Sequence, residues 1–184
     1  MRILTGKFKG FPIAGAPRDR LRPTANKVRQ AIMDVLGGDL RGGLGLDLFC
    51  GTGAVGLEAL SRGAREVWFV EKERRLCENL KKTLHRLGLK RSAKVYVQDA
   101  LRQLRRFSEG RILFDFILAD PPYERGWGSR LVEEISRLRV LSPSGWLVIE
   151  MSKREVVPDR LEPLVKRSEK RYGDTVVRYF QAEP

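Results

Sequence analysis

Cysteine and histidine are scarce in this sequence. Its 184 residues include two cysteines, Cys50 and Cys77, and one histidine, His85. Two cysteines form at most one disulfide, and three such side chains cannot complete the four-ligand set of a structural zinc site. The scarcity excludes a disulfide framework and a Cys/His metal site, and it favours a reducing, cytoplasmic setting. We interpret Cys50 as a small buried apolar residue rather than a nucleophile, and His85 as structural.

Long apolar segments are missing as well. No run approaches the roughly 18 apolar residues of a membrane-spanning helix. The opening residues, MRILTGK, lack the apolar core of a signal peptide. We therefore expect a cytoplasmic protein with no membrane partner.

Basic residues, by contrast, are abundant. Thirty-six Lys and Arg face 23 Asp and Glu, which gives a formal charge of +13, while 42% of the chain is hydrophobic. A packed globule with this charge predicts an anionic partner, most often nucleic acid. The excess is concentrated in residues 1–45, where nine basic side chains face three acidic ones. The alternative for such a charge run is a solvated face with no partner.

Residues 1–43 predict a basic N-terminal extension. Residues 1–5 and 8–14 are typical of two short strands joined through Gly6 as a small β-hairpin. A Pro- and Arg-rich loop follows, and then an amphipathic helix that Thr24 caps and Gly37 ends.

Residues 44–184 predict one α/β domain. Short apolar runs, which indicate strands, occur at 44–49, 66–70, 93–97, 114–119 and 145–150, and helical patterns occur at 55–61, 74–87, 100–107 and 128–141. This alternation indicates βαβ units and a mostly parallel sheet with helices on both faces. The segments 164–172 and 176–182 predict a C-terminal antiparallel hairpin.

A glycine-rich loop follows the first of these strands, in the sequence DLFCGTGAVG from residue 47 to 56. Gly51, Gly53 and Gly56 match G-x-G-x-x-G, where missing Cβ atoms let the backbone turn sharply and approach a ligand. Glycines that serve only a tight turn are the plainer interpretation. Glu71, at the end of the second strand, and Asp99, after the third, favour a nucleoside-containing cofactor.

Asp47 bears on the choice of cofactor. A dinucleotide would place its anionic pyrophosphate against the glycine loop and the following helix N-terminus, where the Asp47 carboxylate is an unfavourable neighbour. A cofactor with an ammonium and a sulfonium group suits this carboxylate better. The charge favours S-adenosylmethionine over NAD, with an NAD-dependent oxidoreductase as the alternative.

These motifs resemble those of class I S-adenosylmethionine-dependent methyltransferases, which have a Rossmann-like fold. In that family the glycine loop underlies the methionine part of the cofactor, the position of Glu71 holds the ribose, and the position of Asp99 bonds the adenine amino group. The resemblance implies a cofactor site made of Asp47, Phe49, Cys50, Gly51, Thr52, Gly53, Glu71, Lys72, Asp99, Ala100 and Asp120.

The tetrapeptide Asp120-Pro121-Pro122-Tyr123 follows the predicted strand 114–119, at the edge where open α/β sheets bind ligands. An exocyclic base amine is a poor nucleophile, because its lone pair is delocalised into the ring. The Asp120 carboxylate and the Pro121 carbonyl can accept hydrogen bonds from the two N–H groups of this amine. The consecutive prolines fix the backbone and lack N–H donors. Tyr123 offers a face on which a base stacks. A rigid turn is the alternative, and a further role of Asp120 as a proton acceptor stays open.

This tetrapeptide resembles the motif of methyltransferases that act on adenine N6, cytosine N4 or guanine N2. The whole chain resembles the RsmD family, bacterial enzymes that methylate a guanine N2 of 16S rRNA. The resemblance rests on residues 2–3, 6–10, 21–24, 28–29 and 56–64 and on the closing hairpin. Cys50 and Thr52 depart modestly from the Ala and Ser expected in the motif.

The RsmD resemblance implies an enzyme that methylates 16S rRNA in an assembled or nearly assembled small subunit, with the segment from Arg22 to Thr24 folded over the cofactor. We expect RNA contacts from basic residues of the extension, namely Lys7, Lys9, Arg18, Arg20 and Arg29. A DNA or RNA adenine-N6 methyltransferase and a non-catalytic RNA-binding protein are the alternatives.

Overall fold

The computed structural model describes residues 1–15, 23–122 and 126–183, and for residues 23–25 only the backbone. The strands are β1 (Leu44–Leu48), β2 (Glu66–Glu71), β3 (Ala93–Val97), β4 (Phe114–Ala119), β5 (Leu141–Ser152), β6 (Arg160–Leu161), β7 (Leu164–Tyr172) and β8 (Thr175–Ala182). The helices are α1 (Pro23–Leu36), the 3-10 helix η2 (Gly37–Leu40), α2 (Ala54–Ser61), α3 (Arg74–Arg86), α4 (Ala100–Glu109) and α5 (Trp127–Leu138).

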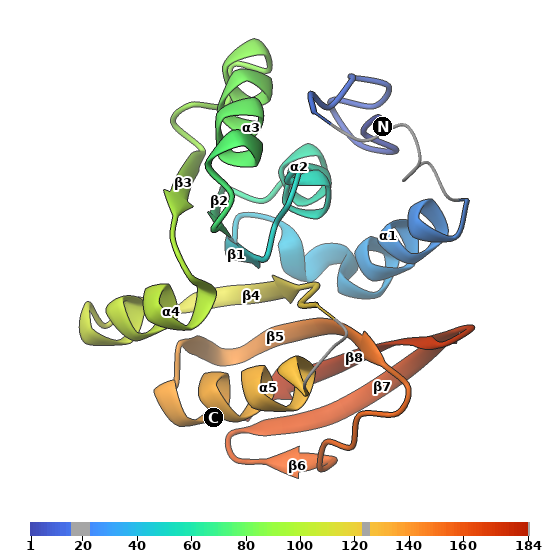
Figure 1. Cartoon of the computed structure of the whole chain (residues 1–184), viewed down its shortest axis with the longest axis vertical. Coiled ribbons are helices and arrows are strands. Elements are labelled where there is room, and N and C mark those ends of the chain that lie inside the picture. Colours follow the sequence, from blue (N-terminus) through green and yellow to red (C-terminus); the bar gives the residue numbers. More distant parts are fainter. Residues whose placement is uncertain (16–22, 123–125, 184) are drawn as a thin grey trace.

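The strands form one sheet in the order β3-β2-β1-β4-β5-β8-β7-β6 (Figure 1). The pairs among β1 to β5 are parallel, whereas β8 is antiparallel to both β5 and β7. The predicted α/β fold, with a mostly parallel sheet and a C-terminal antiparallel hairpin, is confirmed. Because β1 and β4 are adjacent, with Leu48 opposite Ala119, the loops that follow them meet at one edge of the sheet.

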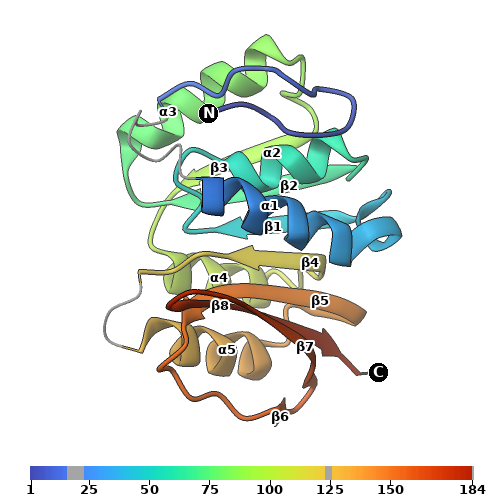
Figure 2. The same cartoon turned by 90° about the vertical axis from the view of Figure 1, so that its right-hand side faces the viewer.

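Helices cover both faces of the sheet, as predicted. One apolar core joins α4 and α5 to the sheet through residues such as Leu104 and Leu131. The other core joins α1, α2 and α3 to the opposite face, through residues such as Ile32, Leu57 and Leu80 (Figures 1 and 2). Ile3 and Ile13 of the N-terminal extension belong to this second core. The two parts expected at residues 1–43 and 44–184 therefore share one apolar interior.

The N-terminal segment, residues 1–15, differs from the predicted pair of strands. It contains one isolated antiparallel bridge, between Arg2 and Pro12, flanked by backbone hydrogen bonds such as Ile3 N to Phe11 O at 3.0 Å. Pro12 has no N–H with which to extend a ladder. The chain between these residues bonds instead to the end of α2, where Lys7 N donates to Ser61 O at 2.8 Å.

Three further predicted boundaries were wrong. α1 begins at Pro23, so Thr24 lies inside the helix rather than at its N-cap; proline is favoured as a first helical residue, because its missing N–H has no partner there. α5 ends at Leu138 because Arg139 adopts a left-handed φ of 49°, and β5 starts at Leu141, before the predicted 145. Pro143, a residue that argues against a strand, concealed this start.

Among the described residues, no helix is long and apolar enough to cross a membrane.

Candidate active site

The glycine loop turns the chain from β1 into α2 at the carboxyl edge of the sheet. Phe49, Gly51 and Gly53 have φ angles of 55°, 56° and 76°, a left-handed conformation that costs glycine little and other residues more. A Cβ at Gly53 would lie 2.5 Å from a methyl carbon of Leu80. These positive φ angles make the sharp strand-to-helix turn expected from the motif.

Asp47 is buried beneath this turn. Its Oδ2 accepts a hydrogen bond from Gly56 N at 2.9 Å, so the carboxylate bonds one of the amides in the first turn of α2 that have no partner within the helix. Burial raises the pKa of Asp47 from 3.8 to about 7; the Gly56 hydrogen bond opposes the rise, and the charges of Asp120 and Glu71 add to it. Asp47 is thus a carboxyl group whose charged form is unfavourable until a cation approaches.

Glu71 holds the other side of the loop. Its Oε2 accepts from Gly51 N at 3.0 Å and its Oε1 from Glu73 N at 3.0 Å. Each ionised carboxylate oxygen has capacity for a second donor, so both oxygens remain able to accept from a ligand hydroxyl. The carboxylate therefore joins the loop after β1 to the loop after β2.

Asp99 begins α4. Its Oδ1 accepts from Arg102 N at 3.0 Å, in an N-cap arrangement. The side chain is exposed at the mouth of the pocket beside Gln98.

One pocket brings many of the predicted residues together. The predicted residues that line it are Phe49, Glu71, Lys72, Asp99, Ala100 and Pro122, and those not predicted are Val70, Gln98 and Trp127. The Trp127 ring meets the Phe49 ring edge to face, with centroids 5.5 Å apart. Trp127 is the first residue of α5, shortly after the tetrapeptide in the chain. This position in the sequence was the signal from which its place in the site could have been predicted.

The remaining predicted cofactor residues whose side chains the structure describes do not line this pocket. Cys50, Gly51, Thr52 and Gly53 form the turn beside it. Burial raises the pKa of the Cys50 thiol well above its usual value, and Asp47 and Glu71 add to the rise. A thiol held neutral in this way is a poor nucleophile, but the side chain is half-buried rather than buried as we expected.

The residues at this edge fit S-adenosylmethionine. Asp47, Glu71 and Asp120 lie close enough that the last two raise the pKa of the first. A ligand with ammonium and sulfonium charges would offset this repulsion, whereas a pyrophosphate would add to it. At Gly51, no described residue other than its two chain neighbours has an atom within 4 Å of the position a Cβ would take, so the loop leaves open space there.

The tetrapeptide follows β4 at the same edge. Asp120 is exposed, Pro121 is buried, and Pro122 is exposed and lines the pocket. Tyr123 lies outside the described residues, as do Arg18, Arg20 and Arg22, and for Thr24 only the backbone is described. Within the described ranges, no three His, Cys, Asp or Glu residues are grouped to hold a metal ion.

Two of the predicted RNA contacts are exposed, and a third is not. Lys7 and Lys9 lie on the surface, at the end of α2 that is remote from the glycine loop. Arg29 is only 4% exposed; its Nη2 donates to Arg2 O at 2.9 Å, and its Nε lies 3.8 Å from Glu58 Oε2. A guanidinium held in the interior cannot reach a phosphate, so the interpretation of Arg29 as an RNA contact does not hold.

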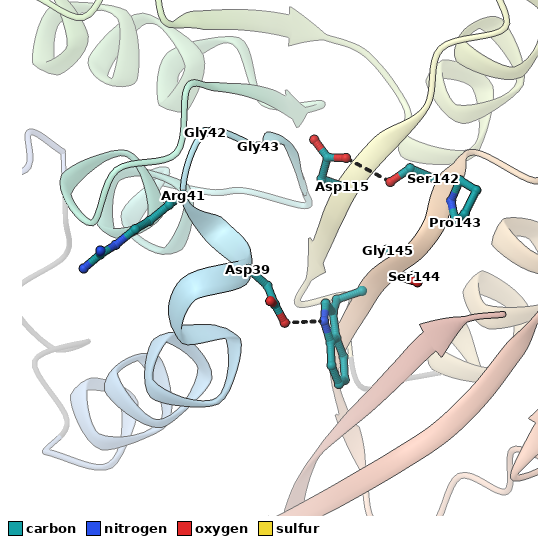
Figure 3. Close-up of a pocket in the computed structure, with 10 residues that line it drawn as sticks. Asp39, Arg41, Gly42, Gly43, Asp115, Ser142, Pro143, Ser144 and Gly145 are labelled. Atoms are coloured by element: carbon teal, nitrogen blue, oxygen red, sulfur yellow. Dashed lines mark hydrogen bonds between the residues drawn. The ribbon is translucent and has the colours of Figure 1, made fainter. Parts of the chain in front are cut away.

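A second pocket lies at the opposite edge of the sheet, where β1 and β4 begin (Figure 3). Asp115 accepts from Leu44 N at 2.8 Å and from Ser142 Oγ at 2.9 Å, and Asp39 accepts from Trp146 Nε1 at 2.9 Å. The Asp115 bonds join β4 to the starts of β1 and β5, and the Asp39 bond joins η2 to β5. None of the predicted site residues within the described ranges lines this pocket, and open α/β sheets bind their ligands at the other edge.

Comparisons with known proteins agree with the geometry. The family described as Conserved hypothetical protein 95 matches residues 1–181. YlbH of Bacillus subtilis (strain 168), which carries a provisional name as an rRNA methyltransferase, is 33% identical over 181 residues, 98% of this chain and 98% of that protein. Ribosomal RNA small subunit methyltransferase D of Escherichia coli (strain K12) is 33% identical over 152 residues, 82% of this chain and 71% of that protein.

A solved structure is similar along the whole chain. The Escherichia coli protein yhhF, also named provisionally as a methyltransferase, superposes with a TM-score of 0.85 at 28% identity, covering 100% of this chain and 98% of that one. The family match, these relatives and the carboxylate-rich pocket agree. The chain belongs to the RsmD family and is an S-adenosylmethionine-dependent methyltransferase.

Proposed function

We propose that this enzyme transfers a methyl group from S-adenosylmethionine to the exocyclic N2 amine of a guanine in 16S ribosomal RNA. One observation carries the proposal: Pro122 of the tetrapeptide lines the same pocket as Glu71 and Asp99. The residues suited to a cofactor and those suited to a base amine therefore meet at one edge of the sheet. Relatives named as small-subunit rRNA methyltransferases support the choice of RNA.

The chain's own residues have the following roles in this proposal. When bound, S-adenosylmethionine supplies an electrophilic methyl group on a sulfonium sulfur. Glu71 binds the ribose hydroxyls, Asp99 bonds the adenine amino group, and buried Asp47 stabilises the positive charge of the cofactor. Phe49 and Trp127, in contact at 5.5 Å between centroids, form an apolar wall of the pocket.

Asp120 and Pro121 hold the acceptor amine. The Asp120 carboxylate and the Pro121 carbonyl accept hydrogen bonds from its two N–H groups, which directs the nitrogen lone pair toward the methyl group. An N–C bond forms, the S–C bond breaks, and one amine proton is released. Positioning and electrostatics supply most of the rate gain, and Tyr123 provides the surface on which the guanine stacks.

The substrate in this proposal is the RNA of an assembled or nearly assembled small subunit, in the cytoplasm. Lys7, Lys9, Arg18 and Arg20 contact its phosphates, and the segment from Arg22 to Thr24 folds over the cofactor. RNA whose own shape presents the target base suits a short chain. The NAD-dependent oxidoreductase that we considered is not retained, because the chain belongs to a methyltransferase family.

Methyl transfer from radiolabelled S-adenosylmethionine tests the proposal. Purified enzyme is incubated separately with 16S rRNA, with small subunits that lack the modification, and with double-stranded DNA. We expect label in the rRNA or the subunits, recovered as N2-methylguanine after digestion. Label in DNA alone, or in N6-methyladenine, would reject the proposal in favour of an adenine methyltransferase.

A further inference from the structure

The basic residues of α3 differ from those of the C-terminal strands in their partners. In β6, β7 and β8, every Arg and Lys except Lys170 forms a salt bridge with a carboxylate. α3 contains Arg74, Arg75, Lys81, Lys82 and Arg86. Within the part of the chain that the structure describes, none of these five forms a salt bridge. The charges of α3 are therefore available to an external anion.

Three of these residues form one stripe along the exposed side of the helix. Arg75, Lys82 and Arg86 are exposed, and at 3.6 residues per turn they lie within about 40° of one another around the helix axis. Cys77, Leu80 and Leu84 are buried on the opposite side. We call Arg75, Lys82 and Arg86 the α3 stripe; it is about 16 Å long at 1.5 Å per residue.

Helix α3, which carries the stripe, lies beside the N-terminal segment (Figure 2). Ala14 N donates to Thr83 Oγ1 at 3.2 Å, and the Arg86 guanidinium lies 5.0 Å from the centroid of the Phe11 ring. Lys9 of the same segment is exposed. Cations that are distant in the sequence thus share one side of the molecule.

One end of the stripe lies near the pocket. α3 starts at Arg74, three residues after Glu71, whose side chain lines the pocket together with that of Lys72. The other end, at Arg86, contacts the N-terminal segment through Phe11. A polyanion on this side would therefore extend from the pocket edge along the helix toward the exposed lysines of residues 1–15.

We propose that the α3 stripe is a docking surface for the phosphate backbone of the rRNA and that the N-terminal segment is the neighbouring part of the same surface. The inference rests on the proposed function. It assigns to a helix of the cofactor domain a role that the sequence pattern had given to residues 1–43 alone. Unpaired surface cations suit this role, because each phosphate contact releases condensed counterions from the RNA.

The test compares two charge-matched variants of the full chain. Arg75→Gln/Lys82→Gln/Arg86→Gln removes the charges of the α3 stripe. Arg160→Gln/Lys166→Gln/Arg167→Gln, the control, removes three basic side chains that already form salt bridges with carboxylates. Affinity for transcribed 16S rRNA is measured by filter binding across a series of KCl concentrations. Calorimetry with S-adenosylhomocysteine, expected to give wild-type affinity for both variants, checks that each is folded.

For the α3 variant we expect at least a tenfold loss of RNA affinity at 100 mM salt. Its slope of log affinity against log salt concentration should be shallower by about 2, because each lost phosphate contact reduces the slope by roughly 0.7–0.9. The control should lose less than threefold and keep its slope. Arg75→Gln/Lys82→Gln, which leaves the contact of Arg86 with Phe11 intact, should give about two-thirds of the slope change and serves if the triple variant does not fold.

Equal losses in the two charge-matched variants, or an unchanged slope in the α3 variant, would overturn the inference. Methyl transfer separates this failure from that of the proposed function. If the wild-type enzyme labels 16S rRNA and the α3 variant has the same KM for it, the docking surface alone is wrong. If the wild type labels neither rRNA nor subunits, the proposed function is wrong.

Discussion

Glu58 and Thr5 join the centre of α2 to the N-terminal segment. The amide nitrogen and Oγ1 of Thr5 both donate to Glu58 Oε1, at 2.7 and 2.6 Å, and Leu4 N donates to Oε2 at 2.9 Å. Glu58 has no exposed surface, and Arg29 lies 3.8 Å from it. One buried carboxylate therefore connects the N-terminal segment, α1 and α2, the helix that opens at the glycine loop.

Gly6→Ala should break this attachment, and Gly10→Ala should not. Both glycines have positive φ, 75° and 86°, so the backbone strain of an alanine is similar. A Cβ at Gly6 would lie 2.1 Å from Ser61 O, whereas at Gly10 no described atom outside the two neighbouring residues lies within 4 Å. We expect Gly6→Ala to lower the free energy of unfolding by about 2 kcal/mol more than Gly10→Ala, in the range of overpacking in a filled interior. Urea denaturation measures both, and equal losses would mean that this contact is not tight in solution.

Asp47→Asn should stabilise the enzyme in the absence of cofactor at neutral and higher pH. The pKa of Asp47 is about 7 in the folded state and 3.8 ordinarily, so between these values the folded state holds a proton that the unfolded state has released. The stability contributed by protonated Asp47 is present below about pH 4 and is lost as the pH rises to about 7. Asparagine avoids this loss and can still accept from Gly56 N. We expect a gain of up to about 4 kcal/mol at pH 8, because the pKa rises from 3.8 to about 7 and each pKa unit corresponds to roughly 1.4 kcal/mol.

The same substitution should weaken cofactor binding. A cation beside Asp47 favours its ionised form, so S-adenosylmethionine should bind the wild type more tightly at pH 8 than at pH 6. Calorimetry of Asp47→Asn should show lower affinity and a flatter pH dependence across this range. A variant with wild-type affinity and the same pH dependence would remove Asp47 from the cofactor site.

Trp127→Ala should weaken cofactor binding about tenfold, because it removes one wall of the pocket and the edge-to-face contact with Phe49. Aromatic pairs of this kind contribute about 0.5–1.5 kcal/mol beyond the burial of their area. Trp146→Phe is the matched control: it removes a hydrogen bond to Asp39 at the opposite edge of the sheet and should leave the affinity unchanged. Titration with S-adenosylhomocysteine measures both. Similar Kd changes in the two variants would argue against a local role for Trp127.

Asp120→Ala should reduce methyl transfer at least 100-fold, in the range of lost general acid–base or positioning groups, while Kd for RNA stays near the wild-type value. Asp120→Asn keeps a side-chain oxygen that can accept a hydrogen bond from an N–H group. If orientation of the amine is its main role, single-turnover rates should be clearly higher for Asn than for Ala. Wild-type turnover in Asp120→Ala would exclude Asp120 from the mechanism.

Local patterns predicted most of the sheet. β3 and β4 have the predicted bounds, Ala93–Val97 and Phe114–Ala119; β3 lies between polar Ser92 and Gln98, and Asp120 ends the apolar run of β4. The sheet edge on which the pocket lies also followed from local order, since parallel strands end at one edge. Phe49, placed at the end of a predicted strand, and Glu71 and Asp99, each placed just after one, line the same pocket for this reason.

Long-range partners explain what the sequence did not predict. Arg29 lies on the same helix as apolar Val28 and Ile32, and its burial depends on Glu58, twenty-nine residues later. The N-terminal segment did not form two strands because its amides bond to Glu58 and Ser61. Hydrophobic periodicity reports which side chains are apolar, not which distant carboxylate a buried cation will meet.

Nucleoside mass spectrometry of 16S rRNA tests the central claim most directly, in cells that carry the wild-type enzyme, lack it, or carry Asp120→Ala. N2-methylguanine at one site should be present with the wild type, absent without the enzyme, and strongly reduced with Asp120→Ala. The same N2-methylguanine content in all three strains would contradict the account.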